Sequence, residues 1–461
     1  MEHRDWLTVV QAYRFALDPT PRQVRDLTRH AGAARVAFNW GLARVKANLD
    51  QRGAERSYGI AEADLTPPVG WSLYAMRKDW NQTKAQVAPW WAECSKEAYN
   101  TGLDQLARAL NNWAESKNGK RKGRQVGFPR FKSRRKHAPS VRFTTGTIRL
   151  EDDCHHVTLP RLGTIKTHES TRKLHRRITD GRTRILSATV RAEAGRWFVS
   201  FTVEVQRAKR APARSDAAVG VDLGIKTLAV FSDGRPAATN PKHYEAARRK
   251  LARLSRAASR RQGPDRRTGA RPSNRWRKAN AARNRVHYRV TNLRRDAIHK
   301  LTTALAREYA TIVVEDLNVA GMVKNRGLAR AICDAGFGEI RRQLAYKTTW
   351  NGGTLIIADR WYPSSKRCSG CGVVKTKLRL SERVFTCTEC GLVLDRDANA
   401  ARNLASLVKH VVAGSGPETQ NGRGADHKTR PDRAGGCEAC PAPGGPRPGR
   451  TGTFAQQWAN H

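Results

Sequence analysis

The spacing of apolar residues predicts a short strand followed by helices in the first quarter of the chain. Residues 9–17 read as a strand, after which Thr20, Pro21 and Gln23 supply a helix cap, a proline at the first helical position and a capping-box glutamine. Apolar residues then recur at intervals of three and four, which predicts one buried helix face: Val24, Leu27, Ala31, Ala34, Phe38 and Leu42. Residues 72–116 continue this pattern, and we interpret their tryptophans as core rather than as base-stacking residues.

The next hundred residues change from a basic loop to alternating strands. Residues 117–136 place Phe128 and Phe131 among Gly, Pro and Arg, a composition suited to a loop that clamps a nucleic-acid backbone, although a solvated linker is the alternative. Residues 141–205 alternate like short strands, and residues 191–205 predict a hairpin that turns at Ala194-Gly195. We expect a small β-barrel-like domain here.

The second half of the chain alternates between apolar strands and a long basic segment. Residues 219–231 predict one strand and residues 312–314 another. Between them, residues 244–309 are rich in arginine, have helical spacing and contain no proline after Pro272, which predicts a basic helical hairpin. Contact with phosphates is favoured over a merely solvated helix pair. The Gly-, Pro- and Arg-rich residues 413–461 are expected to be disordered.

The charge of the chain identifies its partner class. Of the 461 residues, 86 are Lys or Arg and 40 are Asp or Glu, which gives a formal net charge of +46. Such a chain repels itself unless a polyanion neutralises it, so nucleic acid is the expected partner. The candidate contacts are arginines and a lysine of the two basic segments: Arg121, Arg124, Arg130, Lys132, Arg248, Arg249, Arg275 and Arg277. No stretch approaches a membrane span and the first residues lack a signal-peptide pattern, so we expect no membrane partner and a cytoplasmic location.

Four of the nine cysteines have the spacing of a metal site. Cys368 and Cys371 form one pair, Cys387 and Cys390 form a second, and a glycine follows each pair. Four thiolates fill a tetrahedral zinc site and leave no position for an activated water, so we predict one structural Zn²⁺ in a zinc ribbon. The pair Cys437 and Cys440 lies in the low-complexity tail and is interpreted as a chance occurrence.

Three acidic positions suggest a second metal centre. Asp222 interrupts an apolar strand, where a lone carboxylate is costly to bury, and Glu315 follows the run Ile312-Val313-Val314. A third acidic cluster, Asp395-Arg396-Asp397, follows the predicted ribbon. Carboxylates from separate elements suit two Mg²⁺ ions that cleave a phosphodiester. A capping or salt-bridging role for each acid taken singly is the alternative.

Four motifs together resemble the TnpB, or OrfB, family of transposon-encoded RuvC-like nucleases. They are GVDLGIKTLAVFSDG at 220–234, VVEDLN at 313–318, the two cysteine pairs, and DRDANAARNL at 395–404. The resemblance covers roughly residues 9–410, because residues 13–23, 31–42 and 127–136 also look like this family. It implies an α/β, RNase H-like nuclease domain with an inserted zinc ribbon. The catalytic, Mg²⁺-binding acids would be Asp222, Glu315 and Asp397, with Asp395 as the rival for the third place.

The resemblance also implies partners and a domain layout. A guide RNA would select a double-stranded DNA target, which the protein would cleave. The layout would be a first β strand at 1–20, a helical recognition lobe at 21–116, a basic loop and wedge-like β domain at 117–215, the nuclease at 216–365, the ribbon at 366–392 and the last nuclease motif at 393–412. Alternatives are an RNA-guided regulator that no longer cuts, which the intact acids oppose, and a compact type V CRISPR effector. A transposase that itself joins DNA ends lacks a candidate nucleophile.

Overall fold

The computed structural model describes residues 6–121, 123–134, 137–208, 211–265, 267–379 and 381–413, with side chains given to residue 408. These residues divide into two compact units, an N-terminal unit of residues 8–207 and a C-terminal unit of residues 208–413 with Trp6 and Leu7. Among the described residues, no helix is long and apolar enough to cross a membrane. The tail that was predicted to be disordered, apart from Ala413, and the Cys437/Cys440 pair lie outside these residues.

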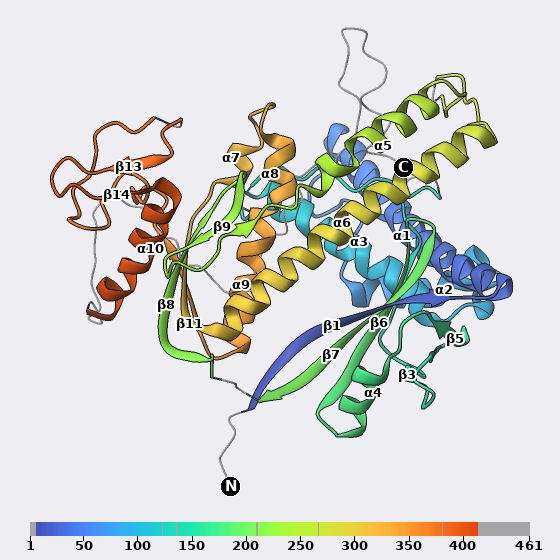
Figure 1. Cartoon of the computed structure of the whole chain (residues 1–461). Coiled ribbons are helices and arrows are strands. Elements are labelled where there is room, and N and C mark those ends of the chain that lie inside the picture. Colours follow the sequence, from blue (N-terminus) through green and yellow to red (C-terminus); the bar gives the residue numbers. More distant parts are fainter. Residues whose placement is uncertain are drawn as a thin grey trace. The chain divides into compact units, whose positions relative to one another are not determined.

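The described part of the N-terminal unit combines four α-helices and one 3-10 turn with one large sheet (Figure 1). Its helices are α1 (Pro21–Ser57), α2 (Leu73–Val87), the 3-10 turn η1 (Trp91–Glu93), α3 (Lys96–Lys117) and α4 (Arg172–Thr179). Its strands are β1 (Trp6–Asp18), β2 (Ser140–Phe143), β3 (Arg149–Leu150), β4 (His156–Leu159), β5 (Gly163–Thr167), β6 (Thr183–Glu193) and β7 (Arg196–Ala208). The capping box at the start of α1 forms as predicted, with Gln23 N donating to Thr20 Oγ1 and Thr20 N donating to Gln23 Oε1.

The seven strands of this unit have the order β2-β6-β7-β1-β5-β4-β3. The first strand of the chain therefore lies in the middle of the sheet. The predicted hairpin turn is correct, because β6 ends at Glu193, β7 begins at Arg196, and Ala194 and Gly195 both have positive φ, +50° and +83°. The described pairings leave β2 and β3 as the two edges, so barrel closure is not among them.

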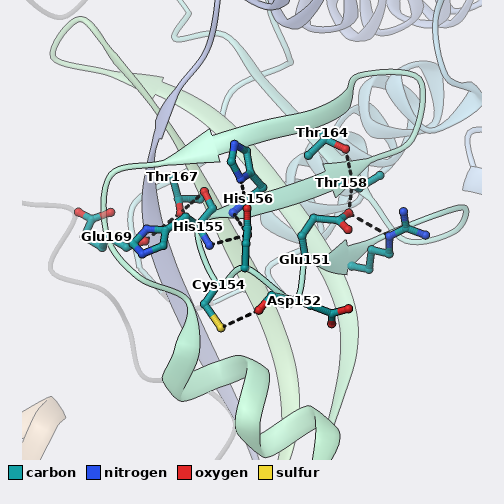
Figure 2. Close-up of polar contacts among 11 residues, drawn as sticks. Glu151, Asp152, Cys154, His155, His156, Thr158, Thr164, Thr167 and Glu169 are labelled. Carbon is teal, nitrogen blue, oxygen red and sulfur yellow. Dashed lines mark hydrogen bonds and ion pairs between the residues drawn. The ribbon is translucent and has the colours of Figure 1, made fainter.

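The polar turn that joins β3 to β4 is stabilised by hydrogen bonds among its own residues and with β5 (Figure 2). Asp153 Oδ1 accepts hydrogen bonds from the backbone of His155 at 2.8 Å and His156 at 3.0 Å, and Thr167 Oγ1 donates to the carbonyl of His155 at 3.0 Å. Thr158 and Thr164 are joined across β4 and β5 at 2.8 Å. Because these polar atoms already have partners among themselves, they stabilise the turn between β3 and β4 and its contact with β5.

The C-terminal unit is a five-stranded sheet covered by helices on both faces. Its strands are β8 (Arg214–Leu223), β9 (Thr227–Phe231), β10 (Ala238–Thr239), β11 (Tyr309–Glu315) and β12 (Thr354–Ala358), in the order β10-β9-β8-β11-β12. The first three strands are antiparallel neighbours, and β11 is parallel to both β8 and β12. The predicted mixed α/β class is confirmed. The prediction of one strand over 219–231 is wrong, because the chain turns at residues 224–226 and separates β8 from β9.

Helices of this unit include the predicted basic hairpin. It consists of α5 (His243–Ser259) packed against α6 (Asn274–Glu308), and α6 leads directly into β11 (Figure 1). The other helices are α7 (Val319–Met322), α8 (Ala329–Ala335), α9 (Phe337–Trp350) and α10 (Arg396–Ala413), and a small separate sheet pairs β13 (Val384–Thr386) with β14 (Val393–Asp395).

The two faces of the sheet bury different side chains. Val219, Val221 and Leu223 of β8 point to the face covered by α6 and α9, as do Ile312 and Val314 of β11. Val313 instead packs with Leu404 of α10 on the other face. Since successive side chains of a strand point to opposite faces, Gly220, Asp222 and Glu315 belong to the face that α10 covers.

Candidate active site

Asp222 and Glu315 lie side by side at the ends of two parallel strands. Val313 pairs with Gly220 and Val314 with Val221, so Glu315 and Asp222 are the next residues along β11 and β8. Both carboxylates stand on the same face, and both residues are half-buried. The two strands therefore bring together two acids that are 93 positions apart in the sequence.

Helix α10 brings the third acid to this face. A Cβ atom at Gly220 would lie 2.0 Å from the carbonyl oxygen of Ala401 and 2.6 Å from the nitrogen of Ala405, so the backbone of α10 rests on this glycine. Asp397 precedes Ala401 by four residues, about 6 Å along a helix. Asp222 follows Gly220 by two residues, about 6.6 Å along a strand. A helix antiparallel to β8 thus carries Asp397 to the level of Asp222.

The electrostatics of Asp222 agree with this placement. Burial, followed by the negative charges of Glu315 and Asp397, raises the pKa of Asp222 well above its usual range. Arg396 opposes this effect but does not outweigh it. Like charges held together in this way favour the protonated acid, and a bound cation would remove that preference.

Glu315 is oriented by a residue that the sequence did not single out. The buried hydroxyl of Ser364 donates a hydrogen bond to Glu315 Oε1. The neighbouring Asp316 is engaged differently, since it forms ion pairs with Arg341 and, at 2.6 Å, with Arg360. Although burial raises the pKa of Asp316, the hydrogen bonds from Arg360 and Arg341 lower it below its usual range. Glu315 is therefore the acid of this pair that is left to face Asp222.

Asp395 and Asp397 occupy different positions at the start of α10. Asp395 is the last residue of β14, and its Oδ1 accepts hydrogen bonds from the backbone nitrogens of Asp397 at 2.9 Å and Ala398 at 3.0 Å. This carboxylate caps the helix. Asp397 lies in the first turn, where Arg396 contacts its Oδ1 at 3.3 Å. The charge of Asp397 raises the pKa of Asp222 more than the charge of Asp395 does.

The four predicted cysteines form a compact cluster. All four Sγ atoms lie within 4.8 Å of one another, with Cys368 and Cys390 separated by 3.6 Å and Cys371 and Cys387 by 3.5 Å. The predicted turn glycines, Gly372 and Gly391, have positive φ of +81° and +70°. The cluster can hold a metal ion. Among the described residues, the carboxylates of Asp222, Glu315 and Asp397 do not form a group as compact as the four thiols.

Two buried asparagines fasten α10 to the first cysteine knuckle. Asn399 Nδ2 donates to the carbonyl of Arg367 at 2.7 Å, and its Oδ1 accepts from the backbone of Ser369 at 2.9 Å. Asn403 Nδ2 donates to the carbonyls of Ser364 at 2.8 Å and Arg367 at 2.6 Å. The segment that carries Cys368 is thereby fixed to the helix that carries Asp397. The Asn-x-x-x-Asn spacing, which puts both amides on one helix face, was the available sign of this in the sequence.

The predicted nucleic-acid contacts are mostly exposed. Arg124, Arg130, Arg248, Arg249, Arg275 and Arg277 are exposed, and Arg121 is half-buried. Lys132 differs, because its Nζ lies 3.8 Å from the centre of the Phe38 ring and contacts Gln105, and burial lowers its pKa to about 8. Its backbone also exchanges hydrogen bonds with Asn39. Lys132 therefore anchors the basic loop to α1.

Three family models match separate stretches of the chain. A "Probable transposase" model of the OrfB_IS605 family matches residues 200–326, a Cas12f1-like TNB domain matches residues 337–404, and a helix-turn-helix domain matches residues 9–54. The first two stretches contain β8, β11 and α10 with the acids and the cysteine cluster. The third corresponds to β1 and one uninterrupted helix, α1, in this structure.

Full-length relatives are also found. "Putative RNA-guided DNA endonuclease Rv2885c" of Mycobacterium tuberculosis is 42% identical over 457 residues, which cover 95% of each chain. "Putative RNA-guided DNA endonuclease InsQ" of Escherichia coli is 32% identical, covering 90% of this chain and 96% of its own length. The solved Cas12f1–sgRNA–target DNA complex aligns with a TM-score of 0.43 at 12% identity, covering 86% of this chain and 99% of that chain.

Proposed function

This chain belongs to the OrfB (TnpB) family of transposon-encoded proteins, and we propose that it is an RNA-guided endonuclease that cleaves double-stranded DNA. The observation that carries this proposal is the meeting of Asp222, Glu315 and Asp397 on one face of the C-terminal sheet. An RNase H-like assignment for this sheet is supported by its order, in which an antiparallel hairpin continues into two parallel strands.

Asp222, Glu315 and Asp397 are the proposed catalytic acids. Their donor atoms are carboxylate oxygens, which Mg²⁺ prefers, and their mutual repulsion at Asp222 is the feature that divalent cations would neutralise. Held by these three acids, a pair of Mg²⁺ ions would activate a water and stabilise the leaving oxygen of a phosphodiester. Within the chain, Ser364 orients Glu315, while Gly220 lets α10 bring Asp397 to the strand ends.

The cysteine cluster fits one structural Zn²⁺. Thiolates around tetrahedral zinc, with bonds of about 2.3 Å, lie about 3.8 Å apart, and the two closest pairs here lie 3.5 and 3.6 Å apart. All four positions are thiols, so this site would be closed to water and would serve the fold of residues 366–392.

Guide RNA and target DNA are the proposed partners. The names of the relatives and the net charge of +46 support a nucleic-acid complex. We assign the helices of residues 21–116 and the sheet of the N-terminal unit to holding this complex. A regulator that binds without cutting is disfavoured by the retention of all three acids. A CRISPR effector differs by genomic context, namely a repeat array in place of transposon ends.

The test uses the protein copurified with RNA transcribed from its own locus. We expect Mg²⁺-dependent cleavage of a plasmid that matches the guide, and a loss of about a hundredfold or more in the cleavage rate for Asp397→Asn, because a ligand to the metal contributes several kcal/mol to transition-state stabilisation.

Asp395→Asn is the matched control, since asparagine caps a helix as well as aspartate does. It should cleave at close to the unaltered rate and bind the same RNA. Cleavage by Asp397→Asn together with inactivity of Asp395→Asn would reverse the assignment of the third acid. A specific RNA bound without any cleavage would support the regulator instead.

A further inference from the structure

A basic cavity with an aromatic wall lies within the N-terminal unit. It has a volume of about 560 Å³ and is formed by α1, by Trp90 and Glu93 around η1, and by Arg134 and Pro139. The lining includes Arg35, Arg134, Trp90, Val36 and Pro139. A volume of this size is in the usual range for small-ligand pockets.

The positive charges of this cavity are not balanced by the protein. Its one lining carboxylate, Glu93, is already paired with Arg29, which also lines the cavity. Among the described residues, no carboxylate pairs with Arg35 or Arg134. Burial and then the charge of Arg134 lower the pKa of Arg35. Two guanidinium groups held near each other without a counter-ion form a site for an anion, and phosphate is the anion whose geometry arginine matches best.

An apolar surface accompanies this anion site. Trp90 is 38% exposed, and its ring is backed by Tyr99 at a centroid distance of 6.2 Å, so the tryptophan is held from behind while part of it faces solvent. Val36 and Pro139 add further apolar lining. Gly32 leaves the α1 side of the cavity open, because a Cβ atom there would meet only Arg35 Nη2, at 3.8 Å.

From this combination we propose that the cavity binds one unstacked nucleotide, with its phosphate on Arg35 and Arg134 and its base against Trp90. A free inorganic anion would make no contact with the apolar wall. The carboxylates of an acidic peptide could pair with the arginines, but they supply no flat ring to stack on the indole of Trp90. Aromatic stacking with flanking arginines is the usual way that proteins hold single-stranded nucleic acid. The proposal rests on the proposed function only in taking the ligand from the guide RNA or the target DNA.

Four variants separate a nucleotide pocket from a structural role. Trp90→Ala should weaken nucleic-acid binding by about tenfold, and Trp90→Phe should recover most of the loss. Gly32→Leu keeps every charge and favours the helix, but it fills the cavity and should weaken binding to a similar extent. Arg35→Gln should weaken binding and reduce the slope of log affinity against log salt concentration by about one.

Trp91→Ala is the matched control, because Trp91 is 37% exposed and adjacent in sequence but lines a different cavity. Its affinity should equal that of the unaltered chain. Dissociation constants are measured for the copurified RNA and, with RNA bound, for the matching DNA. Weakened RNA binding identifies a guide nucleotide, and weakened DNA binding alone identifies a target nucleotide.

Unchanged affinity for both nucleic acids in Trp90→Ala and Gly32→Leu would overturn the proposal. Since binding is read directly, a protein that fails to cleave can still support the pocket. If no RNA copurifies, the proposed function fails, and the pocket is tested with a single-stranded DNA of about twenty nucleotides, where equal binding by all variants would overturn it as well.

Discussion

Replacing Gly220 by alanine tests the close contact on which the candidate active site depends. The added Cβ atom would lie 2.0 Å from the carbonyl oxygen of Ala401, whereas ordinary van der Waals contact begins at 3.4 Å. The difference, 3.4 − 2.0 = 1.4 Å, is the distance by which α10 or β8 must move. This movement is costly in free energy, because the atoms in contact, Ala401 O and Ala405 N, belong to the backbone of α10.

The expected consequence is a large loss of cleavage with a smaller loss of stability. Asp397 is carried on α10, so a shift of this size separates it from Asp222, and misplacement by about 1 Å costs about a hundredfold in rate. Overpacking of this kind costs about 1–3 kcal/mol of folding free energy. Gly220→Ala should therefore fold, bind RNA and cleave guided DNA at about one hundredth of the unaltered rate.

The assay is single-turnover cleavage of a matched plasmid at saturating Mg²⁺, with thermal unfolding measured in parallel. Gly338→Ala is the control, because Gly338 also lies in the C-terminal unit, within α9, and no atom lies within 4 Å of its added Cβ. It should cleave at the unaltered rate. If Gly220→Ala cleaves as fast as this control while folded, then the packing of α10 on β8 does not position the third acid.

Three further predictions concern stability and metals. Asp222→Asn should stabilise the metal-free protein at pH 7, since the raised pKa of Asp222 means that stability is lost as the pH rises through that pKa. Each pKa unit is worth about 1.4 kcal/mol, and equal stability of the two proteins in chelator at pH 7 would contradict this. Gly102→Ala should lower the unfolding free energy by about 1–3 kcal/mol, because its Cβ would lie 2.0 Å from Ala34 O. Denaturant titration against Gly53→Ala, whose Cβ meets nothing within 4 Å, checks it. Removing the proposed zinc, by chelation or by Cys371→Ser, should abolish most cleavage, because Asn399 and Asn403 join α10 to the knuckle and Asn403 also bonds the Ser364 carbonyl. Zinc-free protein, verified by elemental analysis, that cuts at the full rate would refute this link.

Local patterns predicted those elements whose stabilising groups are close in sequence. The capping box of Thr20 and Gln23, and the turn at Ala194 and Gly195, each depend on residues at most three positions apart. The turn between β8 and β9 was missed for a related reason. The turn does contain Gly224 and the polar Lys226, but Ile225 between them continues the apolar pattern of the two strands, so the segment was read as one strand.

Long-range pairing was beyond such patterns. The place of β1 in the middle of a sheet whose other strands begin at residue 140 depends on hydrogen bonds such as those that pair Leu17 with Thr167. The alternation of residues 9–17 predicts a strand and indicates which of its side chains share a face, but it carries no information about which strands pair with it. The helical pattern of residues 72–116 likewise predicted all four of its tryptophans to be core, although only Trp80, at 4% exposed, is buried; Trp113 is half-buried, and Trp90 and Trp91 are exposed.

The same distinction explains why the candidate acids could be named but not all ranked. Asp222 stands out as a charge inside an apolar strand, and Glu315 as the polar end of another, so each is visible in its own segment. Asp395 and Asp397 are equivalent by that criterion, since both lie at the start of the same helix, and only the family resemblance favoured Asp397. What separates them is helix geometry. A carboxylate at the cap position turns back to the free backbone N–H groups, whereas one in the first turn projects from the side of the helix. The side on which Asp397 lies is set four residues later by Ala401, which rests on Gly220. This contact between α10 and β8 is the reason for proposing Asp397 as the third acid.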